Sequence, residues 1–287
     1  MTPMSGVPAV APPAAKEKSN RSLGKKAGGL GGLLLVLLAK SKALLAALKF
    51  GKLATTFGSM LVSVAFYAAI YSWKFAIGFV LSIFVHEMGH VLALKRRGIP
   101  VEGMFFIPFL GAAVSFKKRP ADPAVDAEIS AAGPLAGWLG GLVCVGVYSL
   151  TGEVFWLVLA HVTFLLNLIN LAPTTPLDGG WIVRAINPKF SLVGAAIGVA
   201  IGIYLHATLL VVIAVLGAIN FAKTANYGDD DIHKKQASPA SRTRVTLAYL
   251  GLLIALGSSL GFSTRALHAD RQARSNANSG RAGAVFD

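Results

Sequence analysis

Val85-His86-Glu87-Met88-Gly89-His90 is the stretch of sequence from which the fold and the chemistry of this chain can be worked out. It holds two histidines four residues apart, which on a helix lie on one face, about a turn apart, and can bind one Zn²⁺. The glutamate between them is placed to act on water at the metal rather than on the metal itself. The flanking residues 75–84 and 91–94 are apolar. The motif is therefore predicted to lie on an apolar helix, whereas a soluble zinc protease would carry it on an amphipathic one.

The composition indicates a membrane protein. Of the 287 residues, 54% are hydrophobic and 14% are charged, and the mean hydropathy is +0.63, whereas soluble domains carry about 25% charged residues. The net charge is +14. The cations lie at the ends of apolar runs, as expected for cytoplasmic segments that face anionic lipid, so nucleic-acid binding is not expected. The single cysteine, Cys144, excludes an internal disulfide and a cysteine-based zinc site.

Both ends of the chain are predicted to lie outside the bilayer core. Residues 1–28 are rich in Pro, Ala, Ser, Gly and Lys, which is typical of a disordered basic tail and not of a signal peptide. In residues 29–52, lysines interrupt apolar blocks that are too short to span, which favours an amphipathic segment on the cytoplasmic face. A short helix packed on the protein is the alternative for this segment. Residues 264–287 are predicted to form a disordered C-terminal tail.

Residues 53–222 are predicted to form a membrane-embedded core. The expected fold is all-α and polytopic, with six or seven transmembrane helices. Four spans are predicted at 53–73, 75–95, 127–150 and 154–172. Residues 190–222 are predicted to form two short helices or one long tilted helix, and an additional span at 245–263 follows a polar loop, 223–244. Basic residues flank the loop 96–123, which places this loop and the N-terminus in the cytoplasm. We expect an integral protein of the plasma (inner) membrane.

Residues 101–118 are apolar but do not fit a span. Pro108 and Gly111 interrupt the run, and strand-like residues stand on either side of the turn that they form. The pattern predicts a short hairpin or re-entrant segment. Its strand edge could bind an extended peptide, and a loop that simply packs over the site is the alternative.

A catalytic zinc takes three protein ligands, so the two histidines need a third residue. Asp178 is the one acid downstream that lies deep in the apolar part of the chain and follows an inward-running span. A carboxylate at that depth is costly unless it has a partner such as a metal ion. Asp178 is the preferred third ligand, and Glu128 and His161 remain alternatives.

The two motifs together resemble those of the site-2 protease family of intramembrane zinc metalloproteases. The resemblance rests on His86-Glu87-x-x-His90, on Asn170-x-x-Pro173-x-x-x-Leu177-Asp178-Gly179 and on the Ala-Gly-Pro segment 132–134, and it covers about residues 50–222. It implies a minimal form without a PDZ or CBS domain.

By this resemblance, one Zn²⁺ is held by His86, His90 and Asp178. Glu87 is the general base, and Asn170 helps to hold the substrate or the oxyanion. The implied reaction is hydrolysis of a peptide bond in or near a transmembrane segment of a single-span or other membrane protein. A metal-ion transporter and an inactive protease-like scaffold are the alternatives, although transporters usually show repeated halves and this chain has no internal repeat.

Overall fold

The computed structural model describes residues 51–109, 111–204, 206, 208–225 and 236–283. The predicted tail 1–28 and nearly all of the predicted interfacial segment 29–52 lie outside these residues. After a helix over residues 51–68, the elements are α2 (Trp73–Arg96), β1 (Val101–Ile107), β2 (Gly111–Phe116), α3 (Pro123–Thr151), α4 (Val154–Asn170), α5 (Asp178–Ile186), α6 (Lys189–Tyr204), α7 (Thr208–Ala225) and α8 (Pro239–Gly283).

Local capping sets the ends of the central helices. The Ser72 side chain accepts a hydrogen bond from the Phe75 amide at the start of α2, and Asp122 does the same for Ala124 at the start of α3. Such side chains satisfy amide groups that have no partner within the helix. Gly152, with a φ of 69°, ends α3 in the left-handed conformation, so that α4 can return alongside α3 after a short turn.

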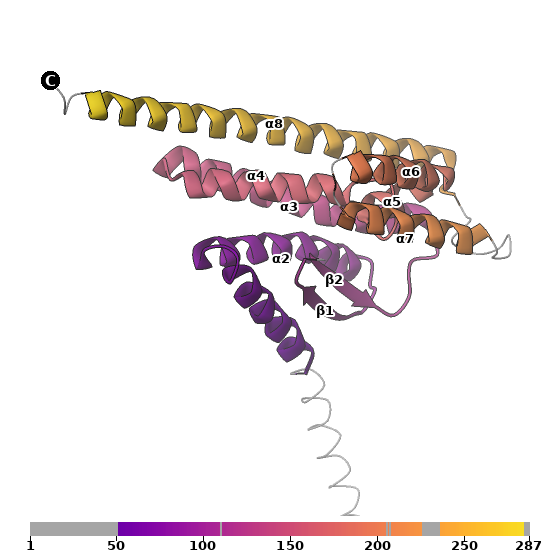
Figure 1. Ribbon diagram of the computed structural model, residues 1–287. Coiled ribbons are helices and arrows are strands. Elements are labelled where there is room, and N and C mark those ends of the chain that lie inside the picture. Colours follow the sequence, from indigo (N-terminus) through magenta and orange to yellow (C-terminus); the bar gives the residue numbers. More distant parts are fainter. Residues whose placement is uncertain (1–50, 110, 205, 207, 226–235, 284–287) are drawn as a thin grey trace, which may run out of the picture. The chain divides into compact units, whose positions relative to one another are not determined.

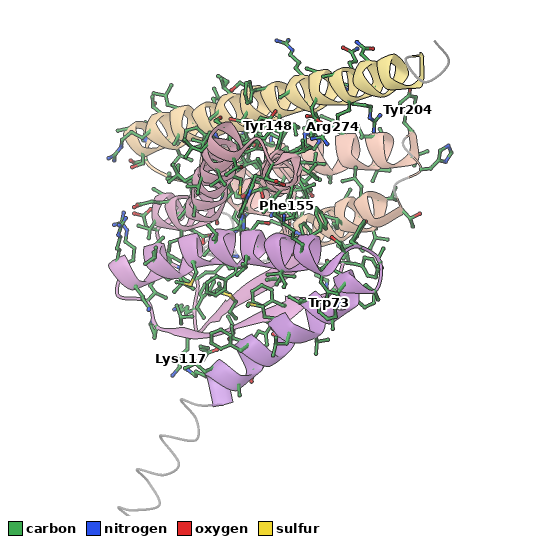
Figure 2. All side chains as sticks on the ribbon, turned by 90° about the vertical axis from the view of Figure 1, so that its left-hand side faces the viewer. Trp73, Lys117, Tyr148, Phe155, Tyr204 and Arg274 are labelled. Atoms are coloured by element: carbon green, nitrogen blue, oxygen red, sulfur yellow. The ribbon has the colours of Figure 1, made fainter. Side chains whose placement is uncertain are left out.

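The helices stack in layers around α3. Helix α3 packs against α2 on one side and against α4 and α8 on the other, and Figure 1 shows α8 running along α4. Figure 2, turned by 90°, shows the same order, with the Phe155 side chain of α4 directed toward α2. The inner faces meet at small residues, since a Cβ at Gly89 would overlap the backbone of Ala132. This close approach brings residues of α2, α3 and α4 together.

Within the part of the chain that the structure describes, three helices are long and apolar enough to cross a membrane: α2, α3 and residues 239–276 of α8. Three further apolar helices are shorter, Val154–Asn170, Lys189–Tyr204 and Leu210–Lys223. Large apolar side chains are exposed on the outer faces, among them Leu81 and Leu92 of α2 and Leu139 and Val143 of α3, as lipid contact requires. The predicted number of six or seven spans stays a prediction.

The segment 101–118 forms the hairpin rather than a re-entrant helix. β1 and β2 pair antiparallel, with Phe105 opposite Ala113 and Ile107 opposite Gly111. Gly111 has a φ of 91°, which a glycine adopts without strain. Met104 and Phe106 are buried in one cluster with Ala76, Val80 and Ile83 of α2. The fold is therefore helical with one two-stranded sheet that packs on the helix carrying the zinc motif.

The C-terminal half agrees with one sequence-based expectation and differs at two other places. Residues 190–222 form two short helices, α6 and α7, which is the first of the two alternatives. Residues 178–186 form α5, a helix that the sequence did not predict. Where a disordered tail was predicted from residue 264, α8 continues to Gly283, because the Ala, Arg and Gln residues that replace the apolar run are also good helix formers.

Candidate metal centre

Helix α2 supplies His86, Glu87 and His90. The helix is unbroken through the motif, so the two histidines occupy one face as their spacing predicts. Their exposed fractions are 3% and 9%, and that of Glu87 is 6%. Three polar side chains are thus buried in a helix whose other face is apolar and exposed.

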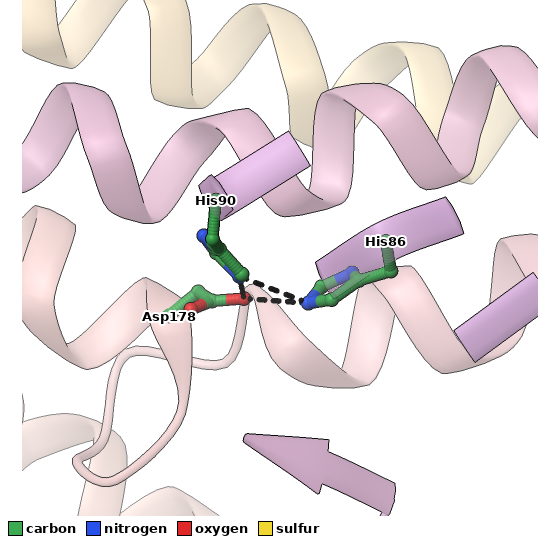
Figure 3. A group of neighbouring side chains, drawn as sticks. All are labelled: His86, His90 and Asp178. Carbon is green, nitrogen blue, oxygen red and sulfur yellow. Dashed lines mark hydrogen bonds and ion pairs between the residues drawn. The ribbon is translucent and has the colours of Figure 1, made fainter. Parts of the chain in front are cut away.

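Asp178, the first residue of α5, brings the third side chain to the two imidazoles. Its Oδ2 atom lies 3.2 Å from His86 Nε2 and 3.4 Å from His90 Nε2, and the two Nε2 atoms are 3.2 Å apart. Figure 3 shows the Asp178 carboxylate reaching both rings. These are the ligand atoms of the one cluster of metal-binding side chains found among the described residues.

His86 Nε2, His90 Nε2 and Asp178 Oδ2 form a triangle whose dimensions fit a tetrahedral zinc ion. Ligand atoms bonded to zinc at about 2.0–2.1 Å with tetrahedral angles lie roughly 3.3–3.4 Å from one another. The three observed separations are 3.2, 3.2 and 3.4 Å. Two imidazoles and one carboxylate are also a ligand set that catalytic zinc sites use, with the fourth position left for water. The residues present therefore suit zinc in both chemistry and spacing.

Hydrogen bonds on the far side of each ring leave both Nε2 atoms facing the centre. His90 Nδ1 lies 2.8 Å from the backbone carbonyl of Ile129 in α3, and His86 Nδ1 lies 2.7 Å from Asn167 Oδ1 in α4. Asn167 in turn donates from Nδ2 to the Thr163 carbonyl, which identifies Oδ1 as the acceptor. Each Nδ1 therefore carries the proton, and each Nε2 has a lone pair available for a metal ion.

Asn167 is the site residue that the sequence analysis passed over. Its side chain is fully buried, and it comes from a helix that the motif itself does not identify. The available signal was an amide in an otherwise apolar span, where a polar side chain needs a partner. Asn170, which was singled out, lies one turn further along α4.

Small residues of α3 allow the rings to sit this close to the helix. A Cβ at Gly133 would overlap the His90 ring and crowd His86, and a Cβ at Gly137 would overlap the Asn167 amide. Glycines four residues apart on a helix allow a neighbouring helix to approach closely. The structure adds that the space left by the missing side chains is occupied by the site residues.

Glu87 and Asn170 have no hydrogen-bond partner among the described residues. Glu87 lies within electrostatic reach of His86, His90 and Asp178, and a buried carboxylate without a hydrogen bond is costly to maintain. Asn170 is half-buried at the last position of α4. Neither side chain is held by a hydrogen bond to another described residue.

The two alternative ligands lie in other interactions. Glu128 pairs with Arg97 at the surface. His161 Nδ1 lies 3.1 Å from Ser263 Oγ of α8. Neither belongs to the cluster with the two motif histidines, so Asp178 is the one of the three candidates that the structure brings to them.

The loop between the hairpin and α3 is fastened beside the site. Arg119 Nη1 donates to Asp126 Oδ1 at 2.7 Å, and the guanidinium lies 3.3 Å from the centre of the Trp181 ring in α5. Burial lowers the pKa of the Arg119 guanidinium, although the Asp126 carboxylate opposes this shift, and arginine stays charged at physiological pH. These contacts tie the loop to the helix that begins with Asp178.

Comparison with known proteins agrees with this geometry. Residues 74–153 match the model of peptidase family M50. The chain is 32% identical over 114 residues to the zinc metalloprotease MJ0392 of Methanocaldococcus jannaschii, which covers 38% of this chain and 33% of that protein. It is 34% identical over 134 residues to Rip3 of Mycobacterium tuberculosis, provisionally named a zinc metalloprotease, covering 42% of this chain and 33% of Rip3.

A third relative, the Synechocystis protein sll0528, is also provisionally named a zinc metalloprotease. It is 28% identical over 158 residues, which cover 51% of this chain and 40% of that protein. The aligned segments thus span between a third and two fifths of the length of these relatives.

Fold and site together indicate a helical membrane protein in which two buried histidines and one aspartate lie close enough to hold a metal ion. The matched segment contains the zinc motif and the whole of α3. Over that segment the chain is similar to peptidase family M50, and the relatives with which it aligns are named zinc metalloproteases.

Proposed function

We propose that this chain is an intramembrane zinc metalloendopeptidase, which hydrolyses a peptide bond in or near a transmembrane segment of a membrane-protein substrate. The observation that carries the proposal is the triangle of two Nε2 atoms and one Oδ2 atom, 3.2–3.4 Å on each side. It is built on a helix that is long and apolar enough to cross a membrane, and the similarity to zinc metalloproteases supports the same reaction.

His86, His90 and Asp178 would hold one Zn²⁺. The backbone carbonyl of Ile129 and the Asn167 amide fix the two rings from behind, so that little rearrangement is needed on metal binding. When bound, zinc supplies a Lewis acid for the scissile carbonyl and lowers the pKa of water toward about 7.

Glu87 is the proton carrier of the proposed reaction. It lies next to His86 on the same helix, is buried, and has no hydrogen-bond partner among the described residues. Its carboxylate accepts the proton of the attacking water and returns it to the amine that leaves when the C–N bond breaks. The charges balance, because the proton lost by water is the one gained by the amine.

The substrate must present an extended backbone, because a helix shields its own peptide bonds. Asn170 supplies amide donors one turn beyond Asn167 and would bind the substrate backbone or the developing oxyanion. The hairpin lies against α2. Thr56 and Ser59 of the first helix bond backbone groups on β1, whereas among the described residues β2 pairs with no strand other than β1. A free strand edge so close to the zinc motif could hold an unwound segment by strand addition.

The side of the membrane on which the site lies can be inferred from the positions of basic residues. Basic residues at the end of α2 and in the following loop, Lys95–Arg97 and Lys117–Arg119, favour a cytoplasmic position for that end of the site and contact with anionic lipid. The N-terminus would then be cytoplasmic as well, in a plasma or inner membrane. The substrate class is a single-span or other membrane protein.

One experiment tests the proposal and separates it from metal transport. The full chain and a Glu87→Gln variant are purified in detergent, and zinc content and cleavage of a model single-span protein are measured. We expect one zinc per chain in both, and cleavage lost in the variant. Glu128→Gln, which removes a carboxylate from a surface ion pair, is the matched control and should cleave normally.

Unchanged cleavage in Glu87→Gln would remove Glu87 from the reaction. Zinc flux into liposomes containing the wild-type chain, without cleavage of the model substrate, would contradict the protease assignment and favour a transporter.

A further inference from the structure

Helix α8 packs against the helices that hold the candidate metal site, although it lies outside residues 74–153, which match the family model. Its buried side chains Tyr249, Leu252 and Leu256 recur at helical spacing and belong to the same core cluster as Phe164 and Leu171 of the α4 segment. A helix that only anchored the chain in the membrane would not need to enter this cluster. Helix α8 therefore contributes to the interior of the protein.

The Tyr249 hydroxyl makes a buried hydrogen bond to the end of α4. It donates to the Leu171 carbonyl at 2.6 Å, across a sequence separation of 78 residues. Leu171 is fully buried and is the C-cap of α4. Carbonyls in the last turn of a helix have no partner within that helix, and a buried one needs a donor from elsewhere. Tyr249 provides that donor.

The same carbonyl is packed against the residue that follows Asp178. A Cβ at Gly179 would overlap the oxygen and carbon of Leu171, so the first turn of α5 rests directly on the Leu171 peptide. The Leu171 carbonyl is therefore in contact with both the Tyr249 hydroxyl and the backbone at Gly179. Any shift of the Leu171 carbonyl moves the helix turn that carries the Asp178 carboxylate.

A second outer helix holds the loop between Leu171 and Asp178. Asn220 of α7 donates from Nδ2 to Thr175 Oγ1 at 3.0 Å, and a Cβ at Gly217 would overlap the Thr174 hydroxyl. The loop that delivers the aspartate is therefore fastened at its start by α8 and in its middle by α7. The histidines, by contrast, are held within α2, α3 and α4.

Two other polar contacts of α8 serve as a comparison, because they lie far from this loop. Trp138 Nε1 donates to Ser259 Oγ at 3.1 Å, and His161 Nδ1 lies 3.1 Å from Ser263 Oγ. At about 1.5 Å per residue, Ser259 and Ser263 are roughly 15 and 21 Å along the helix from Tyr249. They attach α8 to α3 and α4 without touching the Asp178 loop.

We propose that Tyr249 is a positioning residue of the metal centre, which holds the Asp178 carboxylate at the distance that zinc requires by fixing the Leu171 peptide beneath Gly179. The inference rests on the proposed function, since it assumes that zinc is the ion bound. It assigns α8 a part in metal affinity, beyond anchoring the chain in the membrane.

The test compares three variants of the full chain in detergent: Tyr249→Phe, Ser259→Ala and Ser263→Ala. Each loses one hydroxyl from α8: Tyr249→Phe and Ser259→Ala lose one hydrogen bond, and Ser263→Ala loses two, to His161 and to the Leu260 carbonyl. The zinc dissociation constant is measured by competition with a chromophoric chelator, and the melting temperature of the zinc-free protein is measured alongside. We expect Tyr249→Phe to raise the dissociation constant about tenfold, at the low end of the effects seen when groups behind a metal ligand are removed.

Ser259→Ala and Ser263→Ala should keep the wild-type dissociation constant within about twofold, while all three variants melt at similarly reduced temperatures. Equal zinc affinity in wild type and Tyr249→Phe would overturn the inference, and so would an equal loss of affinity in all three variants. A wild-type chain that binds no stoichiometric zinc would instead refute the proposed function.

A measurement on the unmodified chain covers the case in which Tyr249→Phe does not fold. Binding linkage is reciprocal, so a contact that favours zinc binding is itself favoured by zinc. Zinc should therefore slow amide hydrogen exchange in residues 171–177 and around Tyr249, but not around Ser263. Exchange around Tyr249 that is unaffected by zinc would contradict the inference.

Discussion

Replacement of Asn167 by leucine tests how far the metal affinity depends on a residue that does not itself bind the metal. In the structure Asn167 Oδ1 accepts from His86 Nδ1 at 2.7 Å, and Asn167 is fully buried. Leucine has a similar size and keeps the core filled, but it offers no acceptor. The Thr163 carbonyl keeps its helix hydrogen bond, so the substitution leaves one buried donor, His86 Nδ1–H, without a partner.

The free-energy cost of the unpaired His86 Nδ1–H group destabilises the zinc-bound state more than the zinc-free state. Without metal, the His86 ring can change its tautomer or rotate, but zinc on Nε2 requires the proton on Nδ1. An unsatisfied buried donor costs about 1–3 kcal/mol, and at about 1.4 kcal/mol per factor of ten this weakens zinc binding roughly 5- to 150-fold. Loss of a group behind a histidine ligand commonly weakens binding by about 10- to 100-fold, so two independent arguments give one range.

The assay is chelator competition on the purified variant, with Thr163→Val as the matched control. Thr163 is buried beside Asn167, and its hydroxyl donates to the Leu159 carbonyl, so the control loses one buried hydrogen bond that does not reach His86. Thr163→Val should bind zinc like wild type. A wild-type zinc affinity in folded Asn167→Leu would refute the reasoning that the amide orients the ring.

Three further outcomes are expected. Gly133→Ala should weaken zinc binding and lower stability by about 1–3 kcal/mol, because the added methyl group overlaps the site imidazoles. Gly146→Ala, whose methyl group meets no atom within 4 Å, should bind zinc like wild type in chelator competition and be no less stable in calorimetry. Asp126→Asn should lower the unfolding free energy by about 1–3 kcal/mol, because Arg119 loses its charged partner. The control Glu128→Gln removes a carboxylate from a surface pair and should lower the unfolding free energy by about 0–1 kcal/mol. Equal losses of unfolding free energy in the two variants, measured by thermal unfolding, would contradict the difference in burial. Removal of zinc by a chelator should abolish cleavage of the model substrate and re-addition should restore it, and cleavage that persists in metal-free protein would argue against zinc as the cofactor.

The central motif could be interpreted from sequence because its geometry is local. The spacing of His86 and His90 places both on one face of any helix, and the apolar flanks identify the helix as one that can cross a membrane. Asp178 could be chosen because acids deep in apolar sequence are scarce in this chain. The hairpin was predicted for a similar reason, since Pro108 and Gly111 mark a turn between strand-like residues.

Other features could not be obtained in this way, because they depend on contacts between distant residues. Asn167 looks like any polar residue in a span until α4 is placed beside α2. Tyr249 meets Leu171 only when α8 lies along α4. Arg119 and Trp181, 62 residues apart (181 − 119), show no pattern that links them, yet their side chains stack.

By itself, the sequence determined the chemistry of this protein: a zinc motif in apolar surroundings, one acid able to complete it, and a resemblance that links the two to proteolysis. Only the tertiary structure decided that the three ligand atoms form a triangle of 3.2–3.4 Å. It also decided which groups hold that triangle in place. The physical reason is that ligand type and helical spacing are local properties of the chain, whereas the orientation of a side chain is set by the groups that pack behind it. Here those groups come from α3, α4 and α8.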